Sequence, residues 1–125
     1  MPSLIRLADT RVLATPAATM RTYVSPTSVN EADISVWRSE MQPDTAGPVH
    51  SIDTDHIVVI LDGRLDAEIG GERVEAHPGD CVLLRAGSSR RLTAGPSGVT
   101  TLTVAVAGST AAAGESEAVP VPWAN

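Results

Sequence analysis

Short segments in which apolar and polar residues alternate dominate the middle of the chain. Leu65, Ala67 and Ile69, for example, alternate with charged residues, as in a strand with one buried and one solvent-exposed face. Turn residues separate such segments at intervals of about eight positions. The turns are expected at 62–63, 70–71, 78–79, 86–87 and 95–98. Short, regularly spaced strands without helical periodicity predict an all-β fold, either a sandwich or a barrel.

The same pattern divides the chain into three parts. Strands are expected at 34–41, 57–61, 64–69, 72–76, 81–84 and 99–106, and residues 32–107 are assigned to a barrel. Residues 1–31 contain several prolines and alternate poorly, so an N-terminal arm with edge strands is expected there. Residues 108–125 are expected to form a linker and an apolar tail. Because Trp123 is a large apolar surface, the tail should dock on its own barrel or on a second subunit, the alternative being a disordered tail.

The composition limits the class of partner. The chain has 125 residues, enough for one domain with its own core, and carries nine basic against fifteen acidic side chains. The net charge of -6 argues against nucleic acid and anionic membranes, and leaves a small molecule as the expected ligand. Cys81 is the single cysteine, which excludes an internal disulfide, and no apolar run is long enough for a membrane span or a secretory signal. These features favour a cytoplasmic protein.

Residues 44–63 and 79–94 resemble the two sequence motifs of the cupins. The first motif runs from a Gly through His-x-His and Glu to a final Gly, and the corresponding residues here are Asp44, His50, Ile52, His56 and Gly63. The second motif has Gly, Pro-x-Gly, His and Asn, and the corresponding residues here are Gly79, Arg85, Gly87, Arg90 and Ala94. The resemblance implies a double-stranded β-helix, that is, a jelly-roll barrel with its metal or substrate inside. It also favours a homodimer, because small cupins commonly pair through edge strands.

The candidate site follows from strand parity and from the motif alignment. Side chains alternate between the two faces of a strand, so His50, Ile52, His56 and Val58 should all point into the barrel. Arg90 is added to this group only because the motif alignment places it at the histidine position of the second motif. Trp37 and Glu40, on the preceding strand, are further candidates for contact with substrate, together with Ile52 and Val58.

The donor set argues against a metal cofactor. Catalytic divalent metals usually have three protein ligands, and His50 and His56 supply only two. Of the carboxylates that could be the third, Asp53 and Asp55 have the wrong parity, and Glu40 lies on the preceding strand, whose facing the sequence leaves open. Arg90 carries a permanent positive charge and offers no lone pair. No cofactor is therefore favoured, and if a divalent metal is bound, His50 and His56 are its expected ligands.

Without metal, the same residues favour acid–base chemistry. A nearby arginine should lower the pKa of the histidines, which leaves a neutral imidazole available as a base. We expect His50 and His56 to move protons and Arg90 to bind a carboxylate or an enolate oxygen, as in a cyclase, isomerase or lyase. The resemblance implies a polyketide-like substrate in bacterial secondary metabolism.

Two other functions are left open by the sequence. One is a metal-dependent cupin, an oxygenase or cyclase, that uses His50 and His56 with a third ligand. The other is a non-catalytic barrel that binds a ligand. Each residue also has a purely structural interpretation: either histidine could bond to backbone inside the barrel, and Arg90 could pair with a carboxylate at the rim.

Overall fold

The protein is built almost entirely of β-strands. The computed structural model describes residues 4–28, 32–113 and 117–125. In chain order its elements are η1 (Leu7–Asp9), β1 (Arg11–Ala14), β2 (Thr19–Val24), β3 (Ile34–Met41), β4 (Ser51–Ile52), β5 (His56–Ile69), β6 (Glu72–Ala76), β7 (Cys81–Leu84), β8 (Arg90–Val106), β9 (Thr110–Ala112), β10 (Val119–Pro120) and η2 (Pro122–Ala124). The all-β class is confirmed, and β3, β6 and β7 have the bounds that the alternation predicts.

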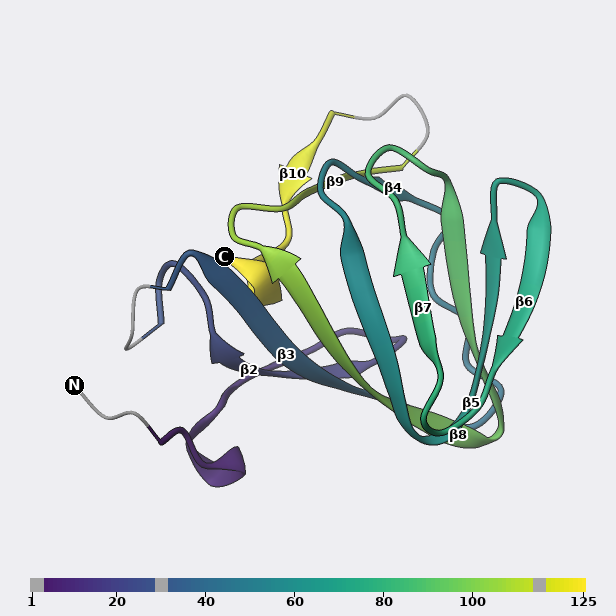
Figure 1. Ribbon diagram of the computed structural model, residues 1–125, viewed down its shortest axis with the longest axis horizontal. Helices are drawn as coiled ribbons and strands as arrows, with labels where there is room; N and C mark the ends of the chain where they lie inside the picture. The colour runs from purple at the N-terminus through teal and green to yellow at the C-terminus, as the bar shows by residue number, and fades with distance from the viewer. Residues whose placement is uncertain (1–3, 29–31, 114–116) are drawn as a thin grey trace.

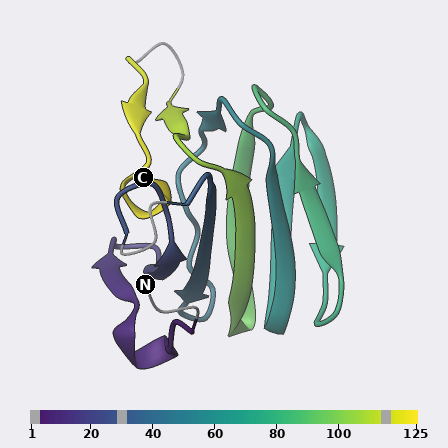
Figure 2. The ribbon, with the colours of Figure 1, turned by 60° about the vertical axis from the view of Figure 1, so that its left-hand side comes forward.

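The strands form two antiparallel sheets. The larger sheet has the order β1-β2-β3-β8-β5-β6, with β7 also paired to β5, and the smaller one has the order β10-β9-β4. In both views β1, β2 and the C-terminal helix η2 lie on one side of the molecule and β6 lies on the other (Figures 1 and 2). Side chains from β2, β3, β5, β7 and β8 all line one interior cavity. The larger sheet therefore curves around a common interior.

Two of the expected turns lie inside long strands. Residues 62–63 belong to β5 and residues 95–98 to β8, and the pairing of β5 with β8 shifts register at Ile60/Asp62 and at Gly63/Leu65. Gly63 has a φ of +78°, and a Cβ at this position would overlap the carbonyl oxygen of Gly98. The glycines thus permit a close approach and a bulge where a turn was expected. Each long strand bends there without ending.

Two apolar clusters form the core. One joins β5, β6, β7 and β8, and consists of Val58, Ile60, Leu65, Ala76, Val82, Leu84, Ala94 and Val99. The other joins β2, β3, β4, β8 and the C-terminal segment, and consists of Met20, Trp37, Ile52, Ala105, Val121 and Ala124. The second cluster is made in part from residues outside the expected barrel of residues 32–107.

The N-terminal part extends the larger sheet. β1 pairs with β2 and β2 pairs with β3, so β1 forms an edge of the sheet, where the sequence placed edge strands. Of the predicted arm, residues 1–3 and 29–31 lie outside the described residues.

The linker expected from residue 108 is wrong for its described part. Thr110–Ala112 is β9, which pairs with β4 and β10, and Ser109 is fully buried. The Asp53 carboxylate accepts hydrogen bonds from the Thr110 amide at 2.7 Å and the Thr110 hydroxyl at 2.8 Å. These contacts order a segment whose small residues carry no hydrophobic alternation. Residues 114–116 of the expected linker lie outside the described residues.

The C-terminal tail docks on its own barrel. Val121 and Ala124 are buried, and Trp123 packs against the apolar cluster that contains Trp37. Figure 1 shows η2 beside β3, and the carbonyl of Trp123 accepts a hydrogen bond from the Thr22 hydroxyl at 2.7 Å. Of the outcomes that the sequence left open, intramolecular docking is the one observed.

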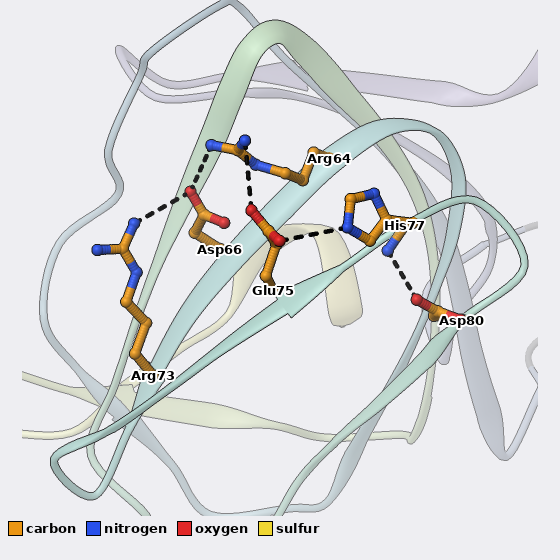
Figure 3. Close-up of polar contacts among 6 residues, drawn as sticks. All are labelled: Arg64, Asp66, Arg73, Glu75, His77 and Asp80. Carbon is orange, nitrogen blue, oxygen red and sulfur yellow. Dashed lines mark hydrogen bonds and ion pairs between the residues drawn. The ribbon is translucent and has the colours of Figure 1, made fainter.

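A charged cluster covers the hairpin of β5 and β6 (Figure 3). The alternation placed Asp66 on a solvent-exposed face, but this residue is buried. Its Oδ2 atom lies 3.0 Å from Arg64 Nη2 and 3.4 Å from Arg73 Nη2. Arg64 also pairs with Glu75 at 3.3 Å. The two long arginine side chains screen the Asp66 carboxylate from solvent.

Candidate functional site

A cavity of about 550 Å³ lies within the curve of the larger sheet. Its wall is mainly apolar and includes Met20, Trp37, Ile52, Val58 and Trp123. His50, His56 and Arg90 also line it. The parity expected for positions 50, 52, 56 and 58 is therefore the one observed, and the neighbouring Ile57 is exposed.

A pair of backbone hydrogen bonds places His50 next to Arg90. The His50 amide donates to the Arg90 carbonyl at 2.9 Å, and the Arg90 amide donates to the His50 carbonyl at 2.8 Å. Arg90 is the first residue of β8, whereas His50 immediately precedes β4. This isolated bridge brings the two cupin motifs together at the cavity.

The His50 ring is oriented by a backbone carbonyl. Its Nδ1 atom lies 2.9 Å from the carbonyl oxygen of Pro48. A carbonyl only accepts hydrogen bonds, so Nδ1 carries the proton of this bond. In the neutral ring the free lone pair is then on Nε2. The sequence left open a purely structural role in which His50 bonds to backbone. The bond to Pro48 is of this kind, and it also selects the tautomer in which the Nε2 lone pair can accept a proton.

His56 is buried at the start of β5 and lies between a tryptophan and a serine. Its ring meets Trp37 edge to face, with centroids 5.2 Å apart, and its Nε2 atom lies 3.2 Å from Ser109 Oγ. Burial, followed by the charges of Arg90 and His50, lowers the pKa of His56 from 6.5 to about 4. The expected lowering by arginine is present, but burial is the larger cause. His56 is consequently neutral at pH 7.

Arg90 is buried, with 1% of its surface exposed. Its Nη2 atom donates to the Arg85 carbonyl at 2.9 Å, whereas Nε and Nη1 have no hydrogen-bond partner among the described residues. No ion pair of Arg90 with a carboxylate is found in the described part of the chain. Burial lowers the pKa of Arg90, and the Asp55 carboxylate opposes this effect. The interpretation of Arg90 as a rim residue paired with a carboxylate is wrong.

Glu40 does not belong to the candidate site, and the expectation that it contacts substrate is corrected. On β3, Trp37, Ser39 and Met41 line the cavity. Glu40 has the opposite parity, and its Oε1 atom pairs with Arg21 Nε at 2.6 Å on the other face.

Two residues that shape the candidate site were not found from the sequence: Ser109, which contacts His56 behind the cavity wall, and Trp123, which lines the cavity. Ser109 bonds to His56 and also lies 2.7 Å from the Thr54 hydroxyl, yet it stands in a run of small residues without any pattern. Trp123 was noted only as a surface that needed cover. Both come from the segment after residue 107, which the motif alignment does not reach.

The residues present do not fit the metal that the resemblance to the cupins implies. In the motif alignment the ligand places are taken by His50, Ile52, His56 and Arg90. Ile52 has no donor atom, and the charge of Arg90 repels a cation. Among the described residues, no group of three or more His, Cys, Asp or Glu side chains is placed to hold a metal ion.

The fold and the cavity together define a small jelly-roll barrel that encloses a site of ligand size. The chain belongs to the cupin family, because the family model for the cupin domain matches residues 37–106. This confirms the resemblance seen in the two motifs. Asp44, which stands in place of the first motif glycine, has a φ of 59°, in the region that favours glycine. No curated protein matches the sequence.

Several solved structures share the fold. The polyketide cyclase RemF from Streptomyces resistomycificus is 22% identical with a TM-score of 0.70, over 85% of this chain and 80% of that one. KdgF from Halomonas sp. is 14% identical with a TM-score of 0.72, over 85% and 94%. A sugar phosphate isomerase of the cupin superfamily from Silicibacter pomeroyi is 15% identical with a TM-score of 0.71, over 90% and 82%. At these identities the likeness concerns the fold alone.

The part of the chain that the structure describes contains no helix that is both long and apolar enough to span a membrane.

Proposed function

We propose that this cupin is a metal-independent enzyme that moves a proton next to the carbonyl group of a small, polyketide-like compound. The observation that carries the proposal is Arg90, which lines an apolar cavity beside His50 and His56. The Nε and Nη1 atoms of its buried guanidinium have no hydrogen-bond partner among the described residues. A fixed cation in a site of low polarity stabilises the negative oxygen that forms when a proton leaves the adjacent carbon.

His50 is the base in this proposal. Its Nε2 lone pair takes a proton from the carbon next to the carbonyl, so a C–H bond breaks and an N–H bond forms. The electron pair of the C–H bond moves into the enolate, whose oxygen accepts hydrogen bonds from Arg90. The bond from Nδ1 to the Pro48 carbonyl holds the ring in place throughout.

The second half of the reaction returns the proton from His50. Delivery to a different carbon gives an isomerase. Delivery to a β-hydroxyl that leaves as water gives a lyase. Attack of the enolate carbon on a second carbonyl of the same molecule, with the proton passed to the new alkoxide, gives a cyclase. His56 stays neutral and, through its contacts with Trp37 and Ser109, forms one wall of the reaction chamber.

The named activities of proteins with the same fold agree with this reaction class. RemF is described as a polyketide cyclase, and the Silicibacter pomeroyi protein as a sugar phosphate isomerase. Both names denote rearrangements of carbonyl compounds, in which proton transfer is a common step.

The test is deuterium incorporation in D₂O, followed by NMR, with aryl methyl ketones whose uncatalysed exchange is slow. We expect the enzyme to accelerate exchange of the methyl protons in the presence of EDTA. His50→Ala should reduce the rate by about 100-fold or more, as for loss of a general base. His77→Ala removes an exposed imidazole and is the matched control, which should exchange at the wild-type rate.

Two results would contradict the proposal. Exchange that stops in EDTA and returns with added divalent metal would make the protein a metalloenzyme. Exchange at the uncatalysed rate in every sample, for all ketones tested, would leave a barrel that binds a ligand without catalysis.

A further inference from the structure

The hydrogen-bond donors of Arg90 indicate what kind of molecule the cavity binds. The Nε and Nη1 atoms are buried and have no partner among the described residues. A buried donor without an acceptor destabilises the fold, and an acceptor supplied by a bound ligand would remove that cost. The acceptor missing from the Arg90 site is therefore expected on the bound molecule.

The shape of the guanidinium group indicates which acceptor. The group is a planar fork with two edges, one formed by Nε and one Nη atom, the other by Nη1 and Nη2. Nη2 has two hydrogens, and the Arg85 carbonyl at 2.9 Å takes one of them. The two hydrogens of Nη2 belong to different edges of the group. The edge that does not contain the hydrogen bonded to Arg85 therefore keeps both of its parallel N–H groups. A free pair of this kind matches the two oxygens of a carboxylate.

The charge around Arg90 also indicates an anion. Glu117 is the only carboxylate among the described residues that line the cavity, and it forms no ion pair with Arg90. Asp55, which acts electrostatically on Arg90, already accepts a hydrogen bond from the Ala86 amide at 2.6 Å and pairs with Arg85. The positive charge in the cavity is thus left for the ligand to neutralise.

The rest of the cavity is suited to an apolar, flat molecule. Both tryptophans of the chain, Trp37 and Trp123, line it, together with Met20 and Ile52. Aromatic rings stack well on such surfaces. The volume of about 550 Å³ lies within the range of small-molecule sites.

We infer that the cavity binds an apolar aromatic carboxylic acid, with the carboxylate on the free edge of Arg90 and the ring system against the tryptophan wall. The inference rests on the proposed function for the identity of this acid as a substrate, and it makes the enolisable compound a keto acid. Of the five N–H groups of Arg90, the Arg85 carbonyl takes one and the carboxylate takes two, so two are left for the enolate oxygen.

The experiment uses 2-naphthoate as the probe and naphthalene-2-carboxamide as its neutral analogue of the same shape. Binding is measured by calorimetry and by the fluorescence of Trp37 and Trp123, which report directly on the cavity. We expect the carboxylate to bind the wild-type protein at least about tenfold more tightly than the amide. Arg90→Met should abolish this preference. Arg91→Met, which removes an exposed neighbouring arginine, should keep it.

The outcomes separate this inference from the proposed function. Equal binding of naphthoate and amide to the wild-type protein would overturn the inference, whatever the folding of Arg90→Met. Faster deuterium exchange on neutral ketones than on their carboxylate analogues would also overturn it, while leaving the function intact. Preferential binding of naphthoate without any catalysed exchange would support the anion site and contradict the enzyme.

Discussion

Arg90 is expected to make the protein less stable than it would be with an apolar residue at the same position. A buried charge with two unpartnered donors costs free energy in the ligand-free protein. Replacement by methionine keeps most of the volume and removes that cost. We expect Arg90→Met to raise the free energy of unfolding by about 1 kcal/mol or more. Urea denaturation measures this free energy of unfolding, and Arg91→Met is the control for the loss of one positive charge. A decrease in stability relative to the control would show that Arg90 supports the fold.

His56 predicts a specific dependence of stability on pH. The pKa of about 4 in the folded protein is below the ordinary histidine value of 6.5, which applies to the unfolded chain. Between these values the unfolded state binds a proton that the folded state does not. Stability is therefore full above about pH 6.5 and falls as the pH decreases towards 4, by on the order of 2 to 3 kcal/mol.

The contribution of His56 is separated from that of the acidic residues by substitution. His56→Gln should remove this part of the slope, while His77→Gln, an exposed histidine, should retain it. The measurement is the free energy of unfolding by urea at several pH values from 4 to 7. Identical slopes for wild type and His56→Gln would contradict the burial of a neutral imidazole.

At the scale of elements, the C-terminal segment completes both the core and the cavity. Val121 is 2% exposed within the cluster of Met20 and Trp37, whereas Val119 in the same segment is 57% exposed. Val121→Ala removes two buried methyl groups, so we expect a loss of about 1 to 2 kcal/mol in the free energy of unfolding. The same substitution at Val119 should change stability by less than about 0.5 kcal/mol. Equal effects, read from thermal or urea unfolding, would mean that the tail is not docked in solution.

The hairpin of β5 and β6 allows a similar comparison between two carboxylates (Figure 3). The Asp66 side chain is 9% exposed and pairs with Arg64 and Arg73, while that of Glu75 is 54% exposed. Asp66→Ala leaves Arg64 and Arg73 without their buried partner and should lower the free energy of unfolding by about 1 to 3 kcal/mol. Glu75→Ala should cost less than about 0.5 kcal/mol, because exposed ion pairs contribute little. If Glu75→Ala lowered the free energy of unfolding by more than Asp66→Ala in denaturant, the burial of Asp66 would be contradicted.

For the whole molecule, local patterns in the sequence predicted the barrel and the residues that face its interior. Period-two alternation and motif spacing located Ile52, His56 and Arg90, because both depend on neighbours along the chain. The bends at Gly63 and Gly98 were taken for turns, since a glycine that permits close strand approach looks the same in sequence as one that ends a strand. The position of Ser109 depends on contacts between distant segments, which no local pattern encodes. The apolar residues of the tail predicted that it docks, but not whether it docks on its own barrel or on a second subunit. Glu40 was misplaced because the parity of its strand was not fixed.

The most direct test is a crystal structure of the protein purified without added metal and grown with 2-naphthoate. The carboxylate oxygens should lie within hydrogen-bond distance of the Arg90 guanidinium, with the naphthalene ring against Trp37 and Trp123. His50 Nε2 should face the bound molecule. A metal ion held between His50 and His56, or a naphthoate bound away from Arg90, would contradict a metal-independent anion site.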